Sequence, residues 1–465
     1  MREPQGVSSS TVTSRLTEQT GVFRPLMVLV APVLAEQCLH LLVAYSDHVL
    51  TGWYFGAPHL AAVGSMSYLL WLLVVLFSFV ATGATALTAR FAGEDDFDQA
   101  QLATNQAFLL GTISCIPLTV LGFLSVHPIA ATLGLQGDAA GLAARYLQYV
   151  FLVLPMIMVE AVGIACLRGV GDTRAGLWIM GAVNVVNVTV SWSLVQGWGP
   201  FPRLGWDGVP LGTACGHLVG GLMVLAFLLK GRSGLRLRWK FLKPDPVMIR
   251  RVLRIGIPGG VDGLSVVFCQ LWFLAIINSL GNVAAAAHGV AIKIEALAYL
   301  PGTAFQVAAA TLAGVYLGAK DEQRAARAVG AACAWGAGTM TLAAIVFFVF
   351  GESLASMMVV QDTAGKTEVV EVAGLLLRIV AVSVPALGLQ MILCGALRGA
   401  GDTRFTMIIS WVGFLTIRIP LAYIAVHYLG WGVVGAWYAM CLDIFARCLL
   451  SVIRYRHGGW TRLKV

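Results

Sequence analysis

The chain has 465 residues, of which 58% are hydrophobic and only 12% are charged, and its mean hydropathy is +0.82. Soluble domains carry about 25% charged residues, so this chain must be solvated mainly by lipid rather than by water. The composition therefore disfavours a secreted enzyme, a nucleic-acid-binding module and a receptor with a single membrane anchor, although the net charge is +8.

Twelve apolar stretches follow one another along the chain, and each is long enough to cross a bilayer as a helix of about 20 residues. They span residues 25–50, 60–89, 105–126, 143–166, 176–197, 209–230, 252–279, 284–316, 328–350, 372–396, 405–427 and 431–453. We therefore predict an all-α polytopic membrane protein with twelve transmembrane helices. We expect no cleavable signal peptide, because residues 1–22 are polar and the first apolar stretch is long enough to span.

Basic residues gather in the polar parts of the chain between and beyond these stretches. Nine of them lie in one central segment, at Lys230, Arg232, Arg236, Arg238, Lys240, Lys243, Arg250, Arg251 and Arg254. Others lie near the two ends, at Arg2, Arg15, Arg24, Arg454, Arg456, Arg462 and Lys464. Under the positive-inside rule, this pattern predicts cytoplasmic termini and a cytoplasmic central segment in a protein of the inner, or plasma, membrane. It also accounts for the net charge without a nucleic-acid partner.

The nine cysteines include no Cys-x-x-Cys pair and fall in or beside apolar stretches. Neither a disulfide framework nor a zinc site is therefore indicated, and the cysteines are interpreted as small packing residues. The sequence also lacks a nucleotide-binding loop of the Gly-x-x-x-x-Gly-Lys-Ser/Thr kind. We expect neither a cofactor nor a bound metal.

The second half of the chain repeats the first. The stretch Leu-Arg-Gly-Val-Gly-Asp-Thr-Arg at 167–174 returns as Leu-Arg-Gly-Ala-Gly-Asp-Thr-Arg at 397–404. Six spans in each half is an even number, so both halves enter the membrane from the same side as a parallel repeat. We expect an N-terminal tail at 1–24, an N-lobe of six helices at 25–230, a basic linker at 231–251, a C-lobe of six helices at 252–453 and a C-terminal tail at 454–465.

Two six-helix bundles that face a central cavity are typical of transporters that open alternately to the two sides of a membrane. The paired turns resemble the hallmark of the multidrug and toxic compound extrusion family. Three further stretches resemble that family: Ala-Ala-His-Gly-Val-Ala-Ile-Lys-Ile-Glu at 286–295, Leu-Gly-Ala-Lys at 317–320 and Ile-Pro-Leu-Ala-Tyr at 419–423. In its details the chain looks similar to the bacterial, DinF-like branch.

The resemblance implies a secondary antiporter that exports bulky, often cationic organic compounds in exchange for protons or sodium ions by alternating access. Its implied partners are small organic substrates and membrane lipid. The coupling ion, H⁺ or Na⁺, is the only inorganic species that the resemblance implies. We expect a monomer that carries no catalytic residues.

The repeated turn itself has a structural interpretation. Its glycines permit left-handed backbone in a tight connection, and Asp172 and Asp402 can cap the helix that follows. Arg168 and Arg398 end the preceding helix, where the helix dipole is negative. Neither the strand nor the spacing of a dinucleotide-binding loop accompanies the motif.

Glu36, His40 and Asp47 lie in the first predicted span, separated by 4 and 7 residues, so they share one stripe of a helix. A charge at the bilayer centre costs at least about 2.5 kcal/mol and is normally tolerated only where it faces protein or water. Asp47 matches the family's first-helix aspartate, which the resemblance implies as a binding site for the coupling cation. The alternatives are a buried packing role for Asp47 and an interfacial position for Glu36 and His40.

Two further positions of the N-lobe follow from the resemblance. Asn187 falls where the family often has a fifth-helix asparagine, whereas Ser191 stands where some relatives carry a second cation-binding aspartate. Glu160 is a candidate for the second carboxylate, and its repeat mate is the uncharged Gln390. The alternative for Glu160 is a hydrogen bond to a neighbouring helix.

The C-lobe departs from the family pattern. Sodium-coupled relatives carry acidic residues in the seventh and tenth helices, but those places fall near Val266 and Leu387 here. The ionisable or polar residues Asp262, Glu295 and Gln270 remain as candidates for a C-lobe cavity. The aromatic candidates for a cavity that accepts a cation are Trp53, Phe268, Trp272 and Tyr299, with core or interface positions as the alternative.

Two other functions fit the composition. A lipid-linked oligosaccharide flippase of the same superfamily is expected to line its cavity with several basic residues, but the mid-membrane candidates here are few: Lys293, Arg378 and Arg418. A polytopic membrane enzyme would need a cluster of nucleophile, base or metal ligands, and no such motif occurs in the sequence. We therefore rank the flippase second and the enzyme third.

Overall fold

The computed structural model describes residues 21–132, 137–359 and 365–463. Most of the predicted N-terminal tail, with Arg2 and Arg15, lies outside the described residues, as does Lys464. Within the described ranges every long element is a helix and no strand occurs. The all-α fold class predicted from the sequence is therefore confirmed.

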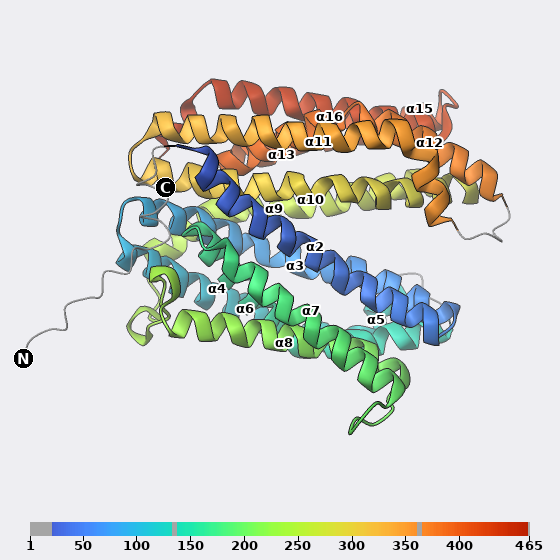
Figure 1. Ribbon diagram of the computed structural model, residues 1–465, viewed down its shortest axis with the longest axis horizontal. Helices are drawn as coiled ribbons and strands as arrows, with labels where there is room; N and C mark the ends of the chain where they lie inside the picture. Colours follow the sequence, from blue (N-terminus) through green and yellow to red (C-terminus); the bar gives the residue numbers. More distant parts are fainter. Residues whose placement is uncertain (1–20, 133–136, 360–364, 464–465) are drawn as a thin grey trace, which may run out of the picture.

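The N-lobe contains six long helices and one short one (Figure 1). The long helices are α2 (Phe23–Tyr54), α3 (Ala57–Gly93), α4 (Phe97–Leu124), α6 (Asp138–Gly169), α7 (Thr173–Gln196) and α8 (Gly208–Leu229). The short helix α5 (Val126–Thr132), which was not predicted, follows α4. The 3₁₀ turns η1 (Gly205–Asp207), η2 (Arg232–Gly234) and η3 (Trp239–Phe241) lie in the connections.

The C-lobe repeats this order with two interruptions. Its helices are α9 (Pro246–Asn278), α10 (Asn282–Gly318), α11 (Glu322–Met358), α12 (Lys366–Ala381), α13 (Val384–Gly399), α14 (Thr403–Trp411), α15 (Ile419–His427) and α16 (Gly432–Arg456). The π-helical turn η4 (Val412–Arg418) joins α14 to α15, and the 3₁₀ turn η5 (Gly459–Arg462) follows α16. Eleven helices of the described chain are long and apolar enough to cross a membrane, and the bent pair α12 and α13 makes a twelfth.

The tenth predicted span, 372–396, differs from a continuous helix. It consists of α12 and α13, which are bent by 53° where they meet. Pro385 stands in the first turn of α13, where its missing N–H interrupts the helical hydrogen bonding. The repeat mate Pro155 is accommodated inside the unbroken α6.

The repeat is visible in the connecting turns as well as in the helix order. Asp95 and Lys320, which follow the second helix of each lobe, both adopt a left-handed backbone, with φ of 59° and 60°. Gly171 and Gly401 do the same in the repeated turns, with φ of 87° and 88°. The two lobes therefore share local backbone geometry, which is why the same residues return at a fixed distance along the chain.

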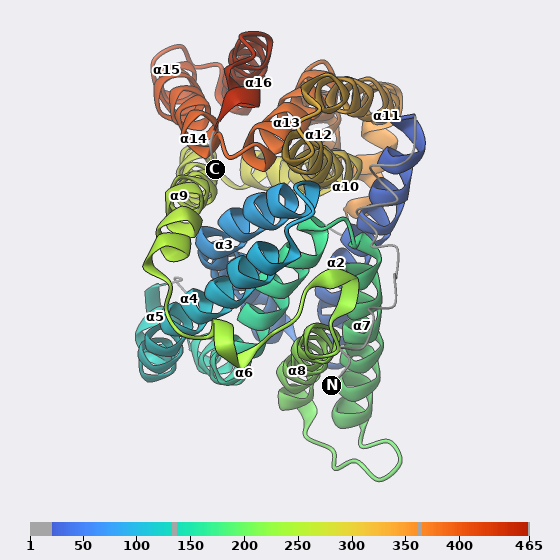
Figure 2. The same ribbon diagram turned by 90° about the vertical axis from the view of Figure 1, so that its left-hand side faces the viewer.

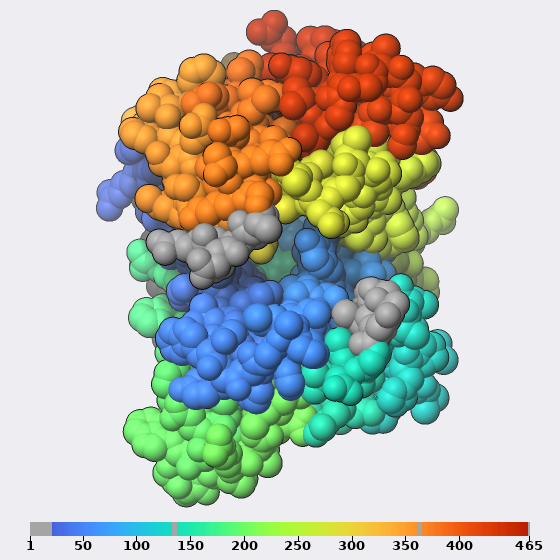
Figure 3. Space-filling model, turned by 90° about the vertical axis from the view of Figure 1, so that its right-hand side faces the viewer, coloured from blue at the N-terminus to red at the C-terminus, as the bar shows by residue number. Residues whose placement is uncertain are grey.

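The two lobes meet along α3, α9 and α10, which lie at the boundary between them (Figure 2). Glycines permit this close approach, because a Cβ on Gly93 would lie only 3.0 Å from Cα of Gly318. We call this end of the bundle, which also holds the repeated turns and residue 463, the terminal end. At the opposite end, the far end, a hollow separates the lobes (Figure 3).

Candidate functional site

Asp47 lies near the far end of α2, and its carboxylate is buried between three other helices of the N-lobe. Asp47 as a whole is only 4% exposed. The hydroxyl of Thr213 on α8 donates to Oδ2 at 2.7 Å, and the hydroxyl of Tyr146 on α6 donates to the same atom at 3.1 Å. The amide of Asn187 on α7 donates to Oδ1 at 3.2 Å. We call Asp47 and these three partners the Asp47 cage.

The cage is held in register by a second set of hydrogen bonds. The Asn187 amide also donates to the Thr213 hydroxyl at 3.0 Å, and Ser46 donates to the Asn187 carbonyl oxygen at 2.9 Å. Ser46 therefore fixes which side of the amide faces Asp47. Because every polar contact of the carboxylate is a donor, the cage suits an ionised carboxyl group, which accepts hydrogen bonds with both oxygens.

Ser191 is buried on α7 but lies outside the cage. Its hydroxyl donates to the Val209 carbonyl at 3.4 Å and has no hydrogen bond to Asp47. A Cβ on Gly212 would collide with this hydroxyl, so a bare backbone on α8 leaves just enough space for it. In the described part of the chain, no group of three or more His, Cys, Asp or Glu side chains is placed to hold a metal ion.

Glu36 and His40 lie on the same stripe of α2 as Asp47, nearer the terminal end. Glu36 is fully buried, and Nη2 of Arg168 lies 2.7 Å from its Oε1. This contact is an ion pair without a hydrogen bond. Within the described ranges, neither carboxylate oxygen of Glu36 accepts a hydrogen bond. His40 lies 4.0 Å from the same carboxylate. Arg168 is thus an ion-pair partner as well as a residue of the last turn of α6.

Glu160 makes the hydrogen bond to a neighbouring helix that was the alternative to its role as a second carboxylate, with a partner that was not predicted. Oε2 of Glu160 lies 3.0 Å from Nδ1 of His217, which belongs to α8 and lies one turn beyond Thr213. Both side chains are mostly buried. The structure does not place Glu160 in the Asp47 cage, so the two carboxylates do not share one site.

In the C-lobe the candidate residues lie apart from one another. Asp262 on α9 binds Arg398 at 2.6 Å. Gln270 is half-buried about two turns further along the same helix. Glu295 is buried on α10, within electrostatic range of Arg418. Asp443 and Arg447, four residues apart on α16, form an ion pair at 2.8 Å.

The predicted capping by Asp402 is wrong, while that by Asp172 is confirmed. Asp172 accepts a hydrogen bond from the Ala175 amide at 3.1 Å, which caps α7. Asp402 makes no such bond at the start of α14, and its carboxylate instead binds Arg454 at 2.7 Å. Asp172 also binds an arginine, Arg232 at 2.7 Å, so the two turns differ in the cap and not in the ion pair.

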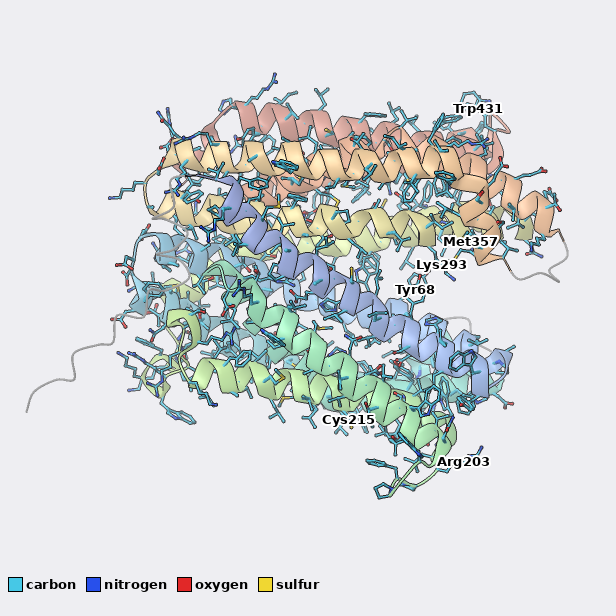
Figure 4. The ribbon with its side chains drawn as sticks, viewed as in Figure 1. Tyr68, Arg203, Cys215, Lys293, Met357 and Trp431 are labelled. Carbon is cyan, nitrogen blue, oxygen red and sulfur yellow. The ribbon has the colours of Figure 1, made fainter. Side chains whose placement is uncertain are left out.

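The aromatic candidates do not form one cluster. Trp53 is exposed and packs edge-on against Trp192, whereas Phe268 and Trp272 are exposed one turn apart on α9. Tyr299 is half-buried one turn from Glu295. Between the lobes, Tyr68 on α3 and Lys293 on α10 project toward the gap (Figure 4).

Three residues of the site were missed from the sequence: Tyr146, Thr213 and His217. Each is a polar residue inside a predicted span, and that signal was available for His217, because an intramembrane histidine is costly unless it has a partner. Tyr146 and Thr213 gave no such signal, because both residue types also occur in spans as ordinary packing residues.

Comparison with known proteins points to one family. A family model described as MatE matches residues 32–193 and 258–424, which is more than half of the chain and includes the first five spans of each lobe.

Relatives and solved structures agree with this match. The chain is 27% identical to "Probable multidrug resistance protein NorM" of Thermotoga maritima over 449 residues, covering 96% of this chain and 95% of that protein. It is 24% identical to "Uncharacterized transporter YisQ" of Bacillus subtilis, covering 98% of both. Its fold matches "Outward-facing conformation of a multidrug resistance MATE family transporter of the MOP superfamily" with a TM-score of 0.87 at 19% identity, covering 96% of this chain and 99% of that one.

Proposed function

The chain belongs to the MatE family of membrane transporters, and from this premise we propose that it exports organic compounds from the cell in exchange for protons or sodium ions. The observation that carries the proposal is the Asp47 cage, a buried carboxylate surrounded by donors from α6, α7 and α8. A buried charge that can be neutralised by a cation gives the N-lobe two states of different charge. Names of relatives that refer to multidrug resistance support an organic substrate.

The driving force of one or two cations suffices for such an exchange. A hundredfold outward gradient of a substrate costs about 2.7 kcal/mol. One elementary charge that returns through 100 mV yields about 2.3 kcal/mol. The two lobes then alternate between a form open at the far end, as in Figure 3, and a form open at the terminal end.

The composition of the cage favours a proton over sodium as the coupling ion. Sodium needs several oxygen ligands, but both oxygens of Asp47 already accept hydrogen bonds and the Asn187 carbonyl oxygen is engaged by Ser46. Ser191 supplies no second carboxylate. A proton needs only one acceptor oxygen, which Asp47 provides.

We propose that the protein is a monomer in the plasma membrane, and the basic central segment supports a cytoplasmic position for the terminal end. A flippase role receives no support from the placement of the buried basic residues. Arg418 and Arg447 both bind Asp443, at 2.8 Å, and Arg398 binds Asp262. These guanidinium groups are therefore engaged by carboxylates and do not line a pyrophosphate site.

The test is Asp47→Asn in purified protein reconstituted into lipid vesicles. Efflux of a cationic fluorescent dye is measured with a proton gradient and with a sodium gradient imposed separately. We expect the wild type to respond to the proton gradient, and Asp47→Asn to lose gradient-driven efflux by at least about tenfold, because the amide cannot take up the ion.

The control is Asp138→Asn, the same chemical change at an exposed position in the first turn of α6. This variant should transport like the wild type. Unchanged efflux by Asp47→Asn under both gradients would exclude Asp47 as the coupling site. Efflux by the wild type that responds to neither gradient would exclude ion-coupled antiport.

A further inference from the structure

A groove on the outer surface of the C-lobe is lined by arginines at the terminal end of the molecule. It has a volume of about 1110 Å³ and follows the first turns of α9 where they lie beside α14. Both helices lie at the edge of the molecule (Figure 2). We call its four basic residues the groove arginines: Arg250, Arg251, Arg254 and Arg404. A second hollow, of about 310 Å³, is lined by three of the same arginines.

The groove arginines differ from the arginines inside the bundle, because no carboxylate binds them. Inside the bundle, Arg398 binds Asp262 and Arg418 binds Asp443. In the described part of the chain, the groove arginines form no ion pair. Among the described residues that line the two hollows only Asp402 is acidic, and its carboxylate is already held by another arginine, at the end of α16. The groove therefore carries positive charge that the protein itself does not neutralise.

Two of these charges are not part of the repeated architecture. Counted from the proline inside the first helix of each lobe, Arg254 takes the place of Val28, and Arg251 takes the place of Pro25. The other two groove arginines have basic mates in the N-lobe. The C-lobe thus concentrates charge at a place where the same fold does without it in the N-lobe, which points to a ligand of the C-lobe.

The length of α9 places the groove arginines at the level of lipid headgroups. The helix has 33 residues, so it is about 50 Å long, whereas the hydrocarbon core of a bilayer is about 30 Å thick. Roughly 10 Å at each end of α9 therefore reaches into the headgroup region. Arg250 and Arg254 lie about 6 and 12 Å from the start of the helix at Pro246, which is the depth where phosphate groups are found.

Apolar side chains follow the arginines toward the centre of the bilayer. Ile257 lines the groove about one turn beyond Arg254 on the same face of α9, and it is 48% exposed. Ile408 lies one turn beyond Arg404 on the same face of α14, and it is 47% exposed. Both helices thus present positive charge at the headgroup level and apolar surface below it. A phospholipid has its phosphate and its acyl chains in this order, whereas a soluble anion gains nothing from the apolar part.

We propose that the groove binds an anionic phospholipid of the phosphatidylglycerol type, with its phosphate at the groove arginines and the upper part of its acyl chains against Ile257 and Ile408. A planar guanidinium matches the oxygens of a phosphate, and basic residues at this depth attract anionic headgroups. The groove is large enough, because pockets for drug-sized molecules measure about 300–1,000 Å³. Binding at this site does not depend on the antiport proposed above.

Native mass spectrometry tests the proposal, because it counts the lipids that stay bound to the purified full-length protein. The protein in mild detergent is titrated with phosphatidylglycerol and, separately, with phosphatidylethanolamine that has the same acyl chains. We expect a single site that retains phosphatidylglycerol at least about tenfold more tightly, because phosphatidylethanolamine has no net charge for the arginines to attract. Equal retention of the two lipids would overturn the proposal.

Variants locate the site. Arg254→Gln and Arg404→Gln each remove one exposed charge of the groove, and each should weaken binding of phosphatidylglycerol about fivefold without changing that of phosphatidylethanolamine. Arg254→Lys keeps the charge and should retain most of the affinity. The control is Arg174→Gln, at the repeat mate of Arg404, which is exposed in the corresponding turn of the N-lobe and does not line the groove. It should match the wild type.

Two results would overturn the assignment of the site or of its ligand. Unchanged binding in the groove variants, or an equal loss in Arg174→Gln, would show that any positive charge at the headgroup level suffices. An excess of inorganic phosphate should leave the bound lipid in place, and displacement by phosphate would show that the arginines take a soluble anion instead. Neither result bears on the proposed antiport, which is measured by efflux in the Asp47→Asn variant.

Discussion

At the scale of single residues, Lys293 has an unusual position for a protein proposed to export cationic compounds. Its side chain is exposed on α10 and projects toward the gap between the lobes (Figure 4). No ion pair of Lys293 is found within the described ranges. A positive charge in the path of a cationic substrate opposes binding, since like charges in a narrow cleft repel each other.

Lys293→Gln should therefore favour cationic substrates. Removal of one positive charge a few ångströms from the substrate is worth about 1 kcal/mol, so the apparent KM for a cationic dye should fall roughly fivefold. An anionic dye of similar size should show the opposite change. The control is Arg203→Gln, in the loop at the outer edge of the far end (Figure 4). An unchanged KM for both dyes would show that Lys293 does not contact the transport path.

Of the Asp47 cage, Asp47 and Asn187 were predictable from the sequence, whereas Tyr146 and Thr213 were not. Asp47 stood out because a carboxylate within an apolar span is rare, and Asn187 because it lies at a fixed distance from the repeated turn. Tyr146 and Thr213 come from helices far away in sequence, and their contact depends on how α6 and α8 pack against α2. Such contacts cannot be derived from the spacing within one helix, which is also why Glu160 was assigned no partner.

At the scale of elements, the π-helical turn η4 marks a crowded site in the C-lobe. Arg418, in this turn, binds Asp443 on α16 at 2.8 Å, and Arg447 binds the same carboxylate. One carboxylate thus holds two buried arginines. Gly413 lies at the centre of this contact, where a Cβ would collide with Asp443 and lie 2.5 Å from Cγ and Cδ of Arg447. The absence of a side chain at Gly413 is what lets the network close.

Gly413→Ala should destabilise the protein, because the added methyl group has no space to occupy. Overpacking of this kind typically costs about 1–3 kcal/mol. We expect a lower midpoint of thermal unfolding for the purified protein in detergent. Gly338→Ala on α11 is the matched control, because a Cβ there meets nothing within 4 Å, and alanine is the better helix former. Equal midpoints for Gly413→Ala and the control would show that the network can shift to admit the methyl group.

The helix order was predictable, but the interruptions within helices were not. Apolar length alone located all twelve spans, since each needs to cover the same bilayer thickness. Hydropathy does not predict the break between α12 and α13 or the π turn η4, because neither feature changes the apolar composition of its span. Pro385 gave a weak signal for the break, but its mate Pro155 lies inside a continuous helix. Tertiary packing decides which proline bends its helix.

At the scale of the whole molecule, the orientation in the membrane follows from where the charges lie. The basic central segment connects α8 to α9 at the terminal end, and Arg250, Arg251, Arg254 and Arg404 line a groove of about 1110 Å³ beside it. At the far end basic residues are sparse. Under the positive-inside rule this asymmetry supports our proposal that the terminal end faces the cytoplasm.

Single cysteines in a variant without the nine native ones test this orientation. Arg203→Cys at the far end should react with a membrane-impermeant maleimide in intact cells. Trp239→Cys, at a position 88% exposed in the central segment, should react only after the membrane is permeabilised. The reverse pattern would mean that the terminal end faces outward and that the proposed direction of export is wrong.

The repeat also defines the approximate two-fold axis that relates the two lobes. Gly93 and Gly318 are repeat mates, one at the end of α3 and the other at the end of α10, and they face each other across the lobe boundary. A Cβ on Gly93 would lie 3.0 Å from Cα of Gly318, and a Cβ on Gly318 would lie 2.9 Å from Cα of Gly93. Two mates related by an axis can touch only where the axis passes between them. The two lobes are therefore in contact at the terminal end, at the point where the repeat axis passes between Gly93 and Gly318.

Gly93→Ala and Gly318→Ala should therefore weaken the form that is closed at the terminal end. If each methyl group costs about 1–3 kcal/mol in that form and nothing in the form open there, the ratio of the two forms shifts roughly 5- to 150-fold. Spin labels on Asp98→Cys and Gln323→Cys, exposed positions on α4 and α11, report the separation of the lobes at this end. We expect a longer mean distance in both variants and no change in Gly330→Ala, where a Cβ meets nothing within 4 Å. Identical distance distributions in all variants would show that the glycine contact does not control which side is open.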